Sequence, residues 1–91
     1  MIHKINEILN EFYPDSELLL ANGFDEAILG VSYDIKYSNH IVVYSRTKCI
    51  DILMKRDRMT YEDASEFFDF NVEGAYVGEK TPIWVDDKLF N

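Results

Sequence analysis

The stretch that decides the fold is residues 40–57, HIVVYSRTKCIDILMKRD. Its first part, HIVVYS, is rich in β-branched residues that pack well on a pleated surface, so we predict a strand there. Ser45 then stands at the position of a helix N-cap, ahead of RTKCIDILMKRD, and predicts that a helix follows. In that helix Cys49 lies on the apolar side.

The residues before this stretch predict a helix and a second strand. Apolar residues recur at helical spacing over residues 2–13, and Pro14 ends that amphipathic helix. Another helical turn is expected after Asp15 or Ser16, ended by a turn at residues 22–23. Residues 27–37 alternate between apolar and polar side chains and predict a half-buried strand. A turn at residues 38–39 makes this strand and the HIVVYS strand a hairpin.

The residues after this stretch predict a further helix and a last strand. Thr60 is the expected N-cap, with Asp63 at the third helical position as a weak capping box, and Gly74 is expected to close the helix as a left-handed residue. TPIWV, residues 81–85, predicts a short strand. We therefore expect an α+β fold over residues 1–91 as one small domain: helix, β-hairpin, two helices and a short final strand, with an antiparallel sheet covered by helices.

Composition limits the function classes. The chain has 91 residues and a net charge of −8, so its mean field repels phosphate backbones and no direct nucleic-acid binding is expected. A basic surface of another protein is the expected partner. No apolar run approaches the roughly 18 residues that span a bilayer, and no secretory signal is recognisable. With Cys49 the only cysteine, no intramolecular disulfide can form, and we expect a reducing, cytoplasmic setting.

The segment DFNVEGAYVGEK, residues 69–80, begins like a calcium-binding loop. Asp69, Asn71 and Glu73 would supply the first three ligands, and Gly74 would be the turn glycine. The twelfth position must supply a bidentate carboxylate, but it is Lys80. We therefore predict no metal site and interpret the segment as a helix end followed by a turn.

The helix that begins after Thr60 carries a stripe of acids. At helical spacing Glu62, Glu66, Asp69 and Glu73 lie within about 60° of one another. One interpretation is that the stripe is solvated or is neutralised by the preceding helix, whose region holds five bases: Arg46, Lys48, Lys55, Arg56 and Arg58. The other is that the stripe faces a basic partner protein.

Residues 74–82, GAYVGEKTP, form a second candidate element. Two glycines and a proline hold this loop in a fixed shape, and rigid loops with an exposed aromatic residue are common binding anchors. Tyr76 and Glu79 are its candidate binding residues, and a small-ligand binder or enzyme that uses this loop is the alternative function. A third hypothesis is self-association through the aromatic residues Phe67, Phe68, Phe70, Tyr76 and Trp84.

Catalytic and cofactor motifs are not found in the sequence. His3 and His40 have no local partner that suggests a triad or a zinc site, and no phosphate-binding loop or dinucleotide fingerprint is present. We therefore predict no catalytic residues and no cofactor, and a binding protein is preferred to an enzyme.

Four segments, GFDEAILGV, IVVYSRTKCIDILM, RMTYEDASEFFDFN and GAYVGEKTPIWV, in that order, resemble a family of small proteins of tailed bacteriophages and prophages. The resemblance covers residues 23–85, and its most specific part runs from Glu66 to Pro82. It implies the cytoplasm of a bacterial host as the compartment, but no particular activity. Combined with the charge layout, it leads to the hypothesis of an acidic inhibitor or modulator of a host or defence protein.

Overall fold

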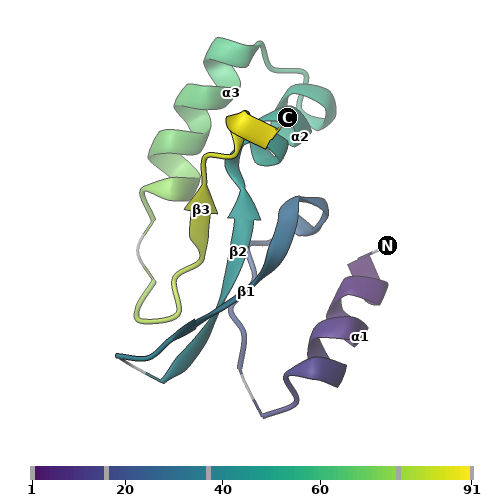
Figure 1. The fold of residues 1–91 in the computed structure, drawn as a ribbon. Helices are drawn as coiled ribbons and strands as arrows, with labels where there is room; N and C mark the ends of the chain where they lie inside the picture. Colours follow the sequence, from purple (N-terminus) through teal and green to yellow (C-terminus); the bar gives the residue numbers. More distant parts are fainter. Residues whose placement is uncertain (1, 16, 37, 76, 91) are drawn as a thin grey trace.

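A computed structural model describes residues 2–15, 17–36, 38–75 and 77–90 (Figure 1). The elements in chain order are α1 (Ile2–Phe12), the 3₁₀ turn η1 (Asp25–Ala27), β1 (Ile28–Asp34), β2 (Asn39–Ser45), α2 (Arg46–Arg56), α3 (Tyr61–Phe68), the π-helical turn η2 (Asp69–Glu73), β3 (Ile83–Val85) and the 3₁₀ turn η3 (Lys88–Phe90). The expected α+β fold and the order of its main elements are confirmed.

β2 is the central strand of a mixed sheet in the order β1-β2-β3. It pairs antiparallel with β1 and parallel with β3, where Tyr44 lies opposite Trp84. The expected antiparallel pairing of the last strand was therefore wrong. In the chain, α2 and α3 connect β2 to β3. They carry the chain away from the end of β2 and back again, so that β3 runs beside β2 in the same direction (Figure 1). Parallel neighbours need such a long crossover.

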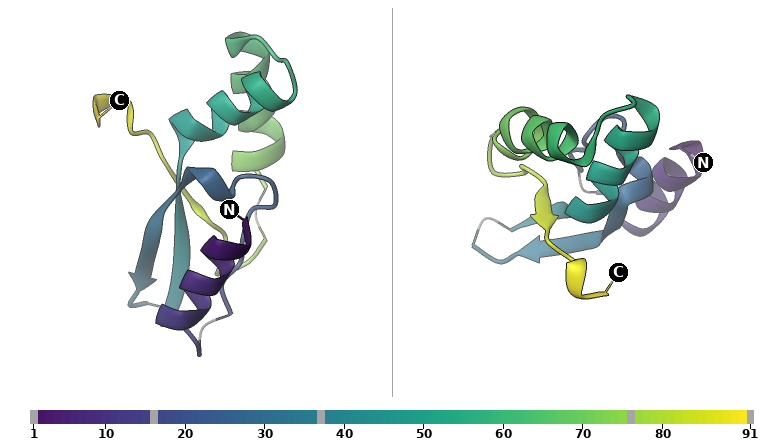
Figure 2. Two further views of the ribbon diagram at one scale, coloured as in Figure 1. Left: turned by 90° about the vertical axis from the view of Figure 1, so that its right-hand side faces the viewer. Right: turned by 90° about the horizontal axis from the view of Figure 1, so that it is seen from above.

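The core lies between the sheet and the two helices α2 and α3, which pack together on one side of it (Figure 2). Val42, Tyr44, Leu53 and Phe68 are completely buried there. The Tyr44 hydroxyl accepts a hydrogen bond of 2.7 Å from the Ala21 N–H, which ties the segment before η1 to the central strand. α1 contacts η1 at the margin of this core.

Ser45 joins three parts of the structure. As predicted, it caps α2: its Oγ accepts a hydrogen bond from the Lys48 N–H at 3.1 Å. The same hydroxyl donates to Oδ2 of Asp87 at 2.7 Å. Ser45 is fully buried and Asp87 is only 9% exposed, so this bond is shielded from water. It fixes the chain after β3 to the junction between β2 and α2.

Two local predictions on the N-terminal side were wrong. Among the described residues of 14–22, none is helical, and the turn of helix forms instead as η1. β1 ends at Asp34, three residues before the predicted end, because the Asp34 side chain accepts a hydrogen bond from the Lys36 N–H at 2.9 Å and turns the chain. Ile35, an apolar residue within the predicted strand, lies beyond the end of β1 and is 83% exposed.

The predicted left-handed conformation of Gly74 was also wrong, since its φ is −73°. The helix instead widens into η2, where the Gly74 N–H donates to the Asp69 carbonyl, five residues back, at 3.1 Å. A Cβ at Gly74 would lie 3.0 Å from that oxygen and 3.3 Å from the Phe70 oxygen. A side chain at Gly74 would therefore crowd these carbonyls, although the backbone conformation itself is one that any residue adopts.

Replacing Ser45 by alanine should destabilise the protein more than replacing Thr60, which caps α3 by the same bond to the third N–H of its helix. An N-cap is worth about 1 kcal/mol, and a buried hydrogen bond to a carboxylate adds about 1.5–3 kcal/mol. We expect Ser45→Ala to cost about 2–4 kcal/mol and Thr60→Ala about 1 kcal/mol in urea unfolding. Equal losses would mean that the Ser45–Asp87 bond contributes nothing.

Candidate functional site

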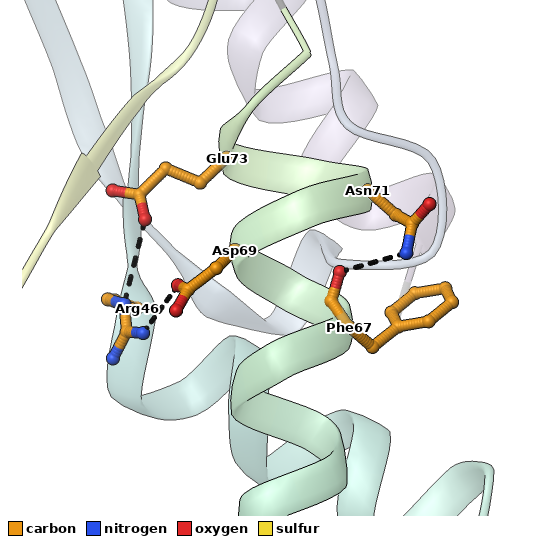
Figure 3. Close-up of polar contacts among 5 residues, drawn as sticks. All are labelled: Arg46, Phe67, Asp69, Asn71 and Glu73. Atoms are coloured by element: carbon orange, nitrogen blue, oxygen red, sulfur yellow. Dashed lines mark hydrogen bonds and ion pairs between the residues drawn. The ribbon is translucent and has the colours of Figure 1, made fainter.

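The acidic stripe predicted from the sequence is divided in the structure. Asp69 and Glu73 turn toward α2, where Arg46 lies between them (Figure 3). Arg46 Nη2 is 2.6 Å from Asp69 Oδ1, and Arg46 Nε is 3.8 Å from Glu73 Oε1. The hydrogen bond with Asp69 raises the pKa of Arg46 further. These two acids are therefore neutralised by a base of the preceding helix, as the first interpretation of the stripe states.

Asp69 and Glu73 can both reach Arg46 because residues four apart on a helix are neighbours on one face (Figure 3). Both lie in the π-helical turn η2, which follows α3 directly. The Arg46 guanidinium also lies over the Phe68 ring, 5.5 Å from its centroid, which adds a cation–π contact.

Two other bases of that region, Lys55 and Arg56, make local contacts. Lys55 pairs with Asp51 on the same helix at 3.0 Å. Arg56 pairs with the neighbouring Asp57 and donates to the Gly23 carbonyl at 2.9 Å. The base-rich helix therefore reaches the acids of η2 through Arg46, at the first residue of α2, because α2 and α3 pack side by side.

Glu66 belongs to a different surface, a shallow groove on the outer face of α3 and η2. The groove has a volume of about 340 Å³ and is lined by Met59, Asp63, Glu66, Phe67, Phe70 and Asn71. Phe70 is 78% exposed and Phe67 39%, so two large rings face solvent in a groove that two carboxylates also line. We call these six residues the acidic aromatic groove. Glu62, also exposed, lies one turn before Glu66 on α3.

Sequence reasoning assigned only Glu66 of this groove to the site. The sequence analysis assigns Asp63 to the capping box, and it assigns Phe67 and Phe70 only to the self-association hypothesis. The signal that would have found the groove was the spacing of Asp63, Phe67 and Phe70, which are three or four residues apart and so share one helical face. Phe68 alone among the three phenylalanines is buried.

The predicted loop residues lie elsewhere. Glu79 accepts a hydrogen bond from Asn39 Nδ2 at 3.4 Å, next to the start of β2. Lys80 donates to the Glu17 carbonyl at 2.8 Å, and Thr81 accepts from the Val77 N–H at 2.9 Å. These bonds fix the loop against the hairpin and the segment after α1. Tyr76 lies outside the described residues.

The residues of the calcium-like segment are engaged in helix contacts. Asp69 to Glu73 form a helical turn and not an open loop, and Asn71 Nδ2 donates to the Phe67 carbonyl at 3.2 Å (Figure 3). Within the described residues, no group of three or more His, Cys, Asp or Glu side chains is placed to hold a metal ion. The same part of the chain contains no helix long and apolar enough to cross a membrane.

The cysteine and one histidine occupy structural positions. Cys49 is fully buried, and burial, together with the charge of Asp87, raises the pKa of its thiol to about 12, so it is not a ready nucleophile at neutral pH. His40 lies between the rings of Tyr13 and Tyr33, with centroid distances of 4.9 and 5.0 Å. It connects the end of α1 to the hairpin.

Comparison with known proteins gives no relatives: no protein-family model matches the chain, and no curated protein or solved structure is similar to it. The arguments about function therefore rest on the geometry above.

Stability should fall at alkaline pH because two buried groups resist ionisation. Burial raises the pKa of Cys49 from 9.0 to about 12 and that of Tyr44 from 10.0 to about 12. The stability that each protonated group contributes to the folded state is fully present below pH 9. It is lost as the pH rises toward 12, because the unfolded chain gives up these protons first. Each group should lower the free energy of unfolding by about 1.4 kcal/mol per pH unit once it ionises in the unfolded chain.

Urea titrations of the wild type and of Cys49→Ala between pH 8 and 10 isolate the thiol, because both proteins keep Tyr44 and its contribution cancels in the comparison. The variant should be less stable overall but should lose less stability over this interval. Parallel pH dependences of the two proteins would contradict the assignment.

Proposed function

We propose that this protein is a binding module whose acidic aromatic groove takes a basic segment of a partner protein, with an apolar side chain of that segment packed against Phe70. The observation that carries the proposal is the exposure of Phe70, 78%, beside two carboxylates in a groove. A large ring so exposed gains about 1.5–3 kcal/mol when it is fully covered.

Charge complementarity supports a basic occupant. Asp63 and Glu66 line the groove, Glu62 lies one turn away, and the whole chain carries −8. Such exposed charges speed association and select partners more than they add affinity. Because Asp69 and Glu73 are already paired with Arg46, the proposal assigns them to the helix contact and leaves Glu62 and Glu66, from the predicted stripe, as partner-facing.

The proposal agrees with the resemblance to phage and prophage proteins, under which the partner would be a host or defence protein and the compartment the host cytoplasm. An inhibitor that covers a basic surface is one such function. The Gly74–Pro82 loop supplies the alternative, a small-ligand function, and a cavity that includes Val77 and Pro82 favours it as a second candidate.

Selection from a random peptide library tests the groove directly. We expect the wild type to enrich peptides in which Lys or Arg flanks a Trp, Phe or Leu. Phe70→Ala should weaken binding of a selected peptide about tenfold or more, as loss of an anchoring ring does. Asp63→Asn with Glu66→Gln should weaken binding and reduce its dependence on salt.

The matched control removes two exposed charges from α1, Glu7→Gln with Glu11→Gln, and should bind as the wild type does. A consensus without basic residues would refute the electrostatic part of the proposal. Undiminished binding by Phe70→Ala would show that the groove is not the site.

A further inference from the structure

β1 is an edge strand of the sheet. It stands at the end of the order β1-β2-β3, and no strand of the described residues pairs with its outer side. Figure 2 shows α2 and α3 on one face of the sheet and β1 at its margin. The outward N–H and C=O groups of such a strand form a template for pairing with another strand.

Large apolar side chains are exposed along this edge. Leu29 is 47% exposed and Tyr33 53%, and Ile35, directly after the strand, is 83% exposed. Side chains two residues apart on a strand lie on one face, so Val31 and Tyr33 share a face, with Leu29 and Ile35 at its two ends. We call these four residues the edge row.

The edge row is complementary to a second copy of itself. When two β1 strands pair antiparallel around Ser32, Val31 of each copy lies opposite Tyr33 of the other, and Leu29 lies opposite Ile35. Pairs of β-branched and aromatic side chains stabilise a sheet. This single register therefore covers all three exposed apolar side chains of the edge row.

The charges of β1 also permit this pairing. Asp34 is the only charged residue of the strand, and in this register it lies opposite Gly30, so no like charges meet directly. A Cβ at Gly30 would have no heavy atom within 4 Å, so there is room at this position. The bulge of β1 lies between Ile28 and Gly30 and leaves residues 30–34 in regular register. The strand has neither the lysine nor the proline that often protects an edge.

We infer that two copies of this chain associate through β1 and form one continuous sheet in the order β3-β2-β1-β1-β2-β3. Each copy carries a net charge of −8, so the two copies repel one another and salt should strengthen the contact. Salt should weaken the binding of a basic segment in the acidic aromatic groove, which lies on α3 and η2. The inference does not depend on that groove, and either can fail alone.

Sedimentation velocity over a range of protein concentrations tests the association. We expect an equilibrium between monomer and dimer, in which the dissociation constant falls when NaCl rises from about 0.05 to about 0.5 M. A chain that stays monomeric at about 1 mM in both salts overturns the inference.

Paired substitutions test the register. Leu29→Lys with Ile35→Lys places lysines opposite one another and should weaken dimerisation about tenfold or more, as should Leu29→Glu with Ile35→Glu. An equimolar mixture of these two variants should restore the dimer, because each lysine then lies opposite a glutamate. Circular dichroism checks that both variants keep the fold, which their exposed positions favour.

The matched control is Leu89→Lys, which replaces an exposed leucine on η3 and should dimerise as the wild type does. The inference is also overturned if either double variant dimerises as the wild type does, or if their mixture stays monomeric.

Discussion

The hydroxyl of Ser45 is the constraint on which the rest of the structure depends. It ends the central strand, begins α2 through the Lys48 N–H and holds the carboxylate of Asp87 at 2.7 Å in a buried setting. Because β3 runs parallel to β2, the chain after β3 arrives at the same end of the sheet as this cap. One side chain therefore joins the central strand, the first core helix and the C-terminal segment.

The second determinant is the change from α-helix to π-helix after Phe68. Asp69 and Glu73 of this turn pair with Arg46, which links α2 to the end of α3, while Phe67, Phe70 and their acidic neighbours line the outer face. Through Asn71 and Val72 the same turn also lines a cavity whose described walls are uncharged. Gly74 permits this geometry because any Cβ there would press on the Asp69 carbonyl. Structure and candidate function thus arise from one short irregular segment.

The two candidate sites differ in their exposure to solvent and in their polarity. The acidic aromatic groove offers exposed rings and charges, which is suited to a protein partner that covers them. The cavity beside Trp84 has uncharged walls among the described residues, which is suited to a small molecule. Both lie next to η2, so this turn contributes to both candidate sites.

The sequence by itself determined the elements whose signals are local. HIVVYS formed a strand, Ser45 and Thr60 capped their helices, and Cys49 was buried, because β-branched content, capping bonds and helical periodicity act over a few residues. Only the tertiary structure decided the parallel pairing of β3, the division of the acidic stripe and the cavity at Trp84. The pairing of β3 depends on where the chain arrives after α2 and α3. The division of the stripe depends on a contact between Arg46 and residues more than twenty positions later. A pattern of neighbouring residues encodes neither of them.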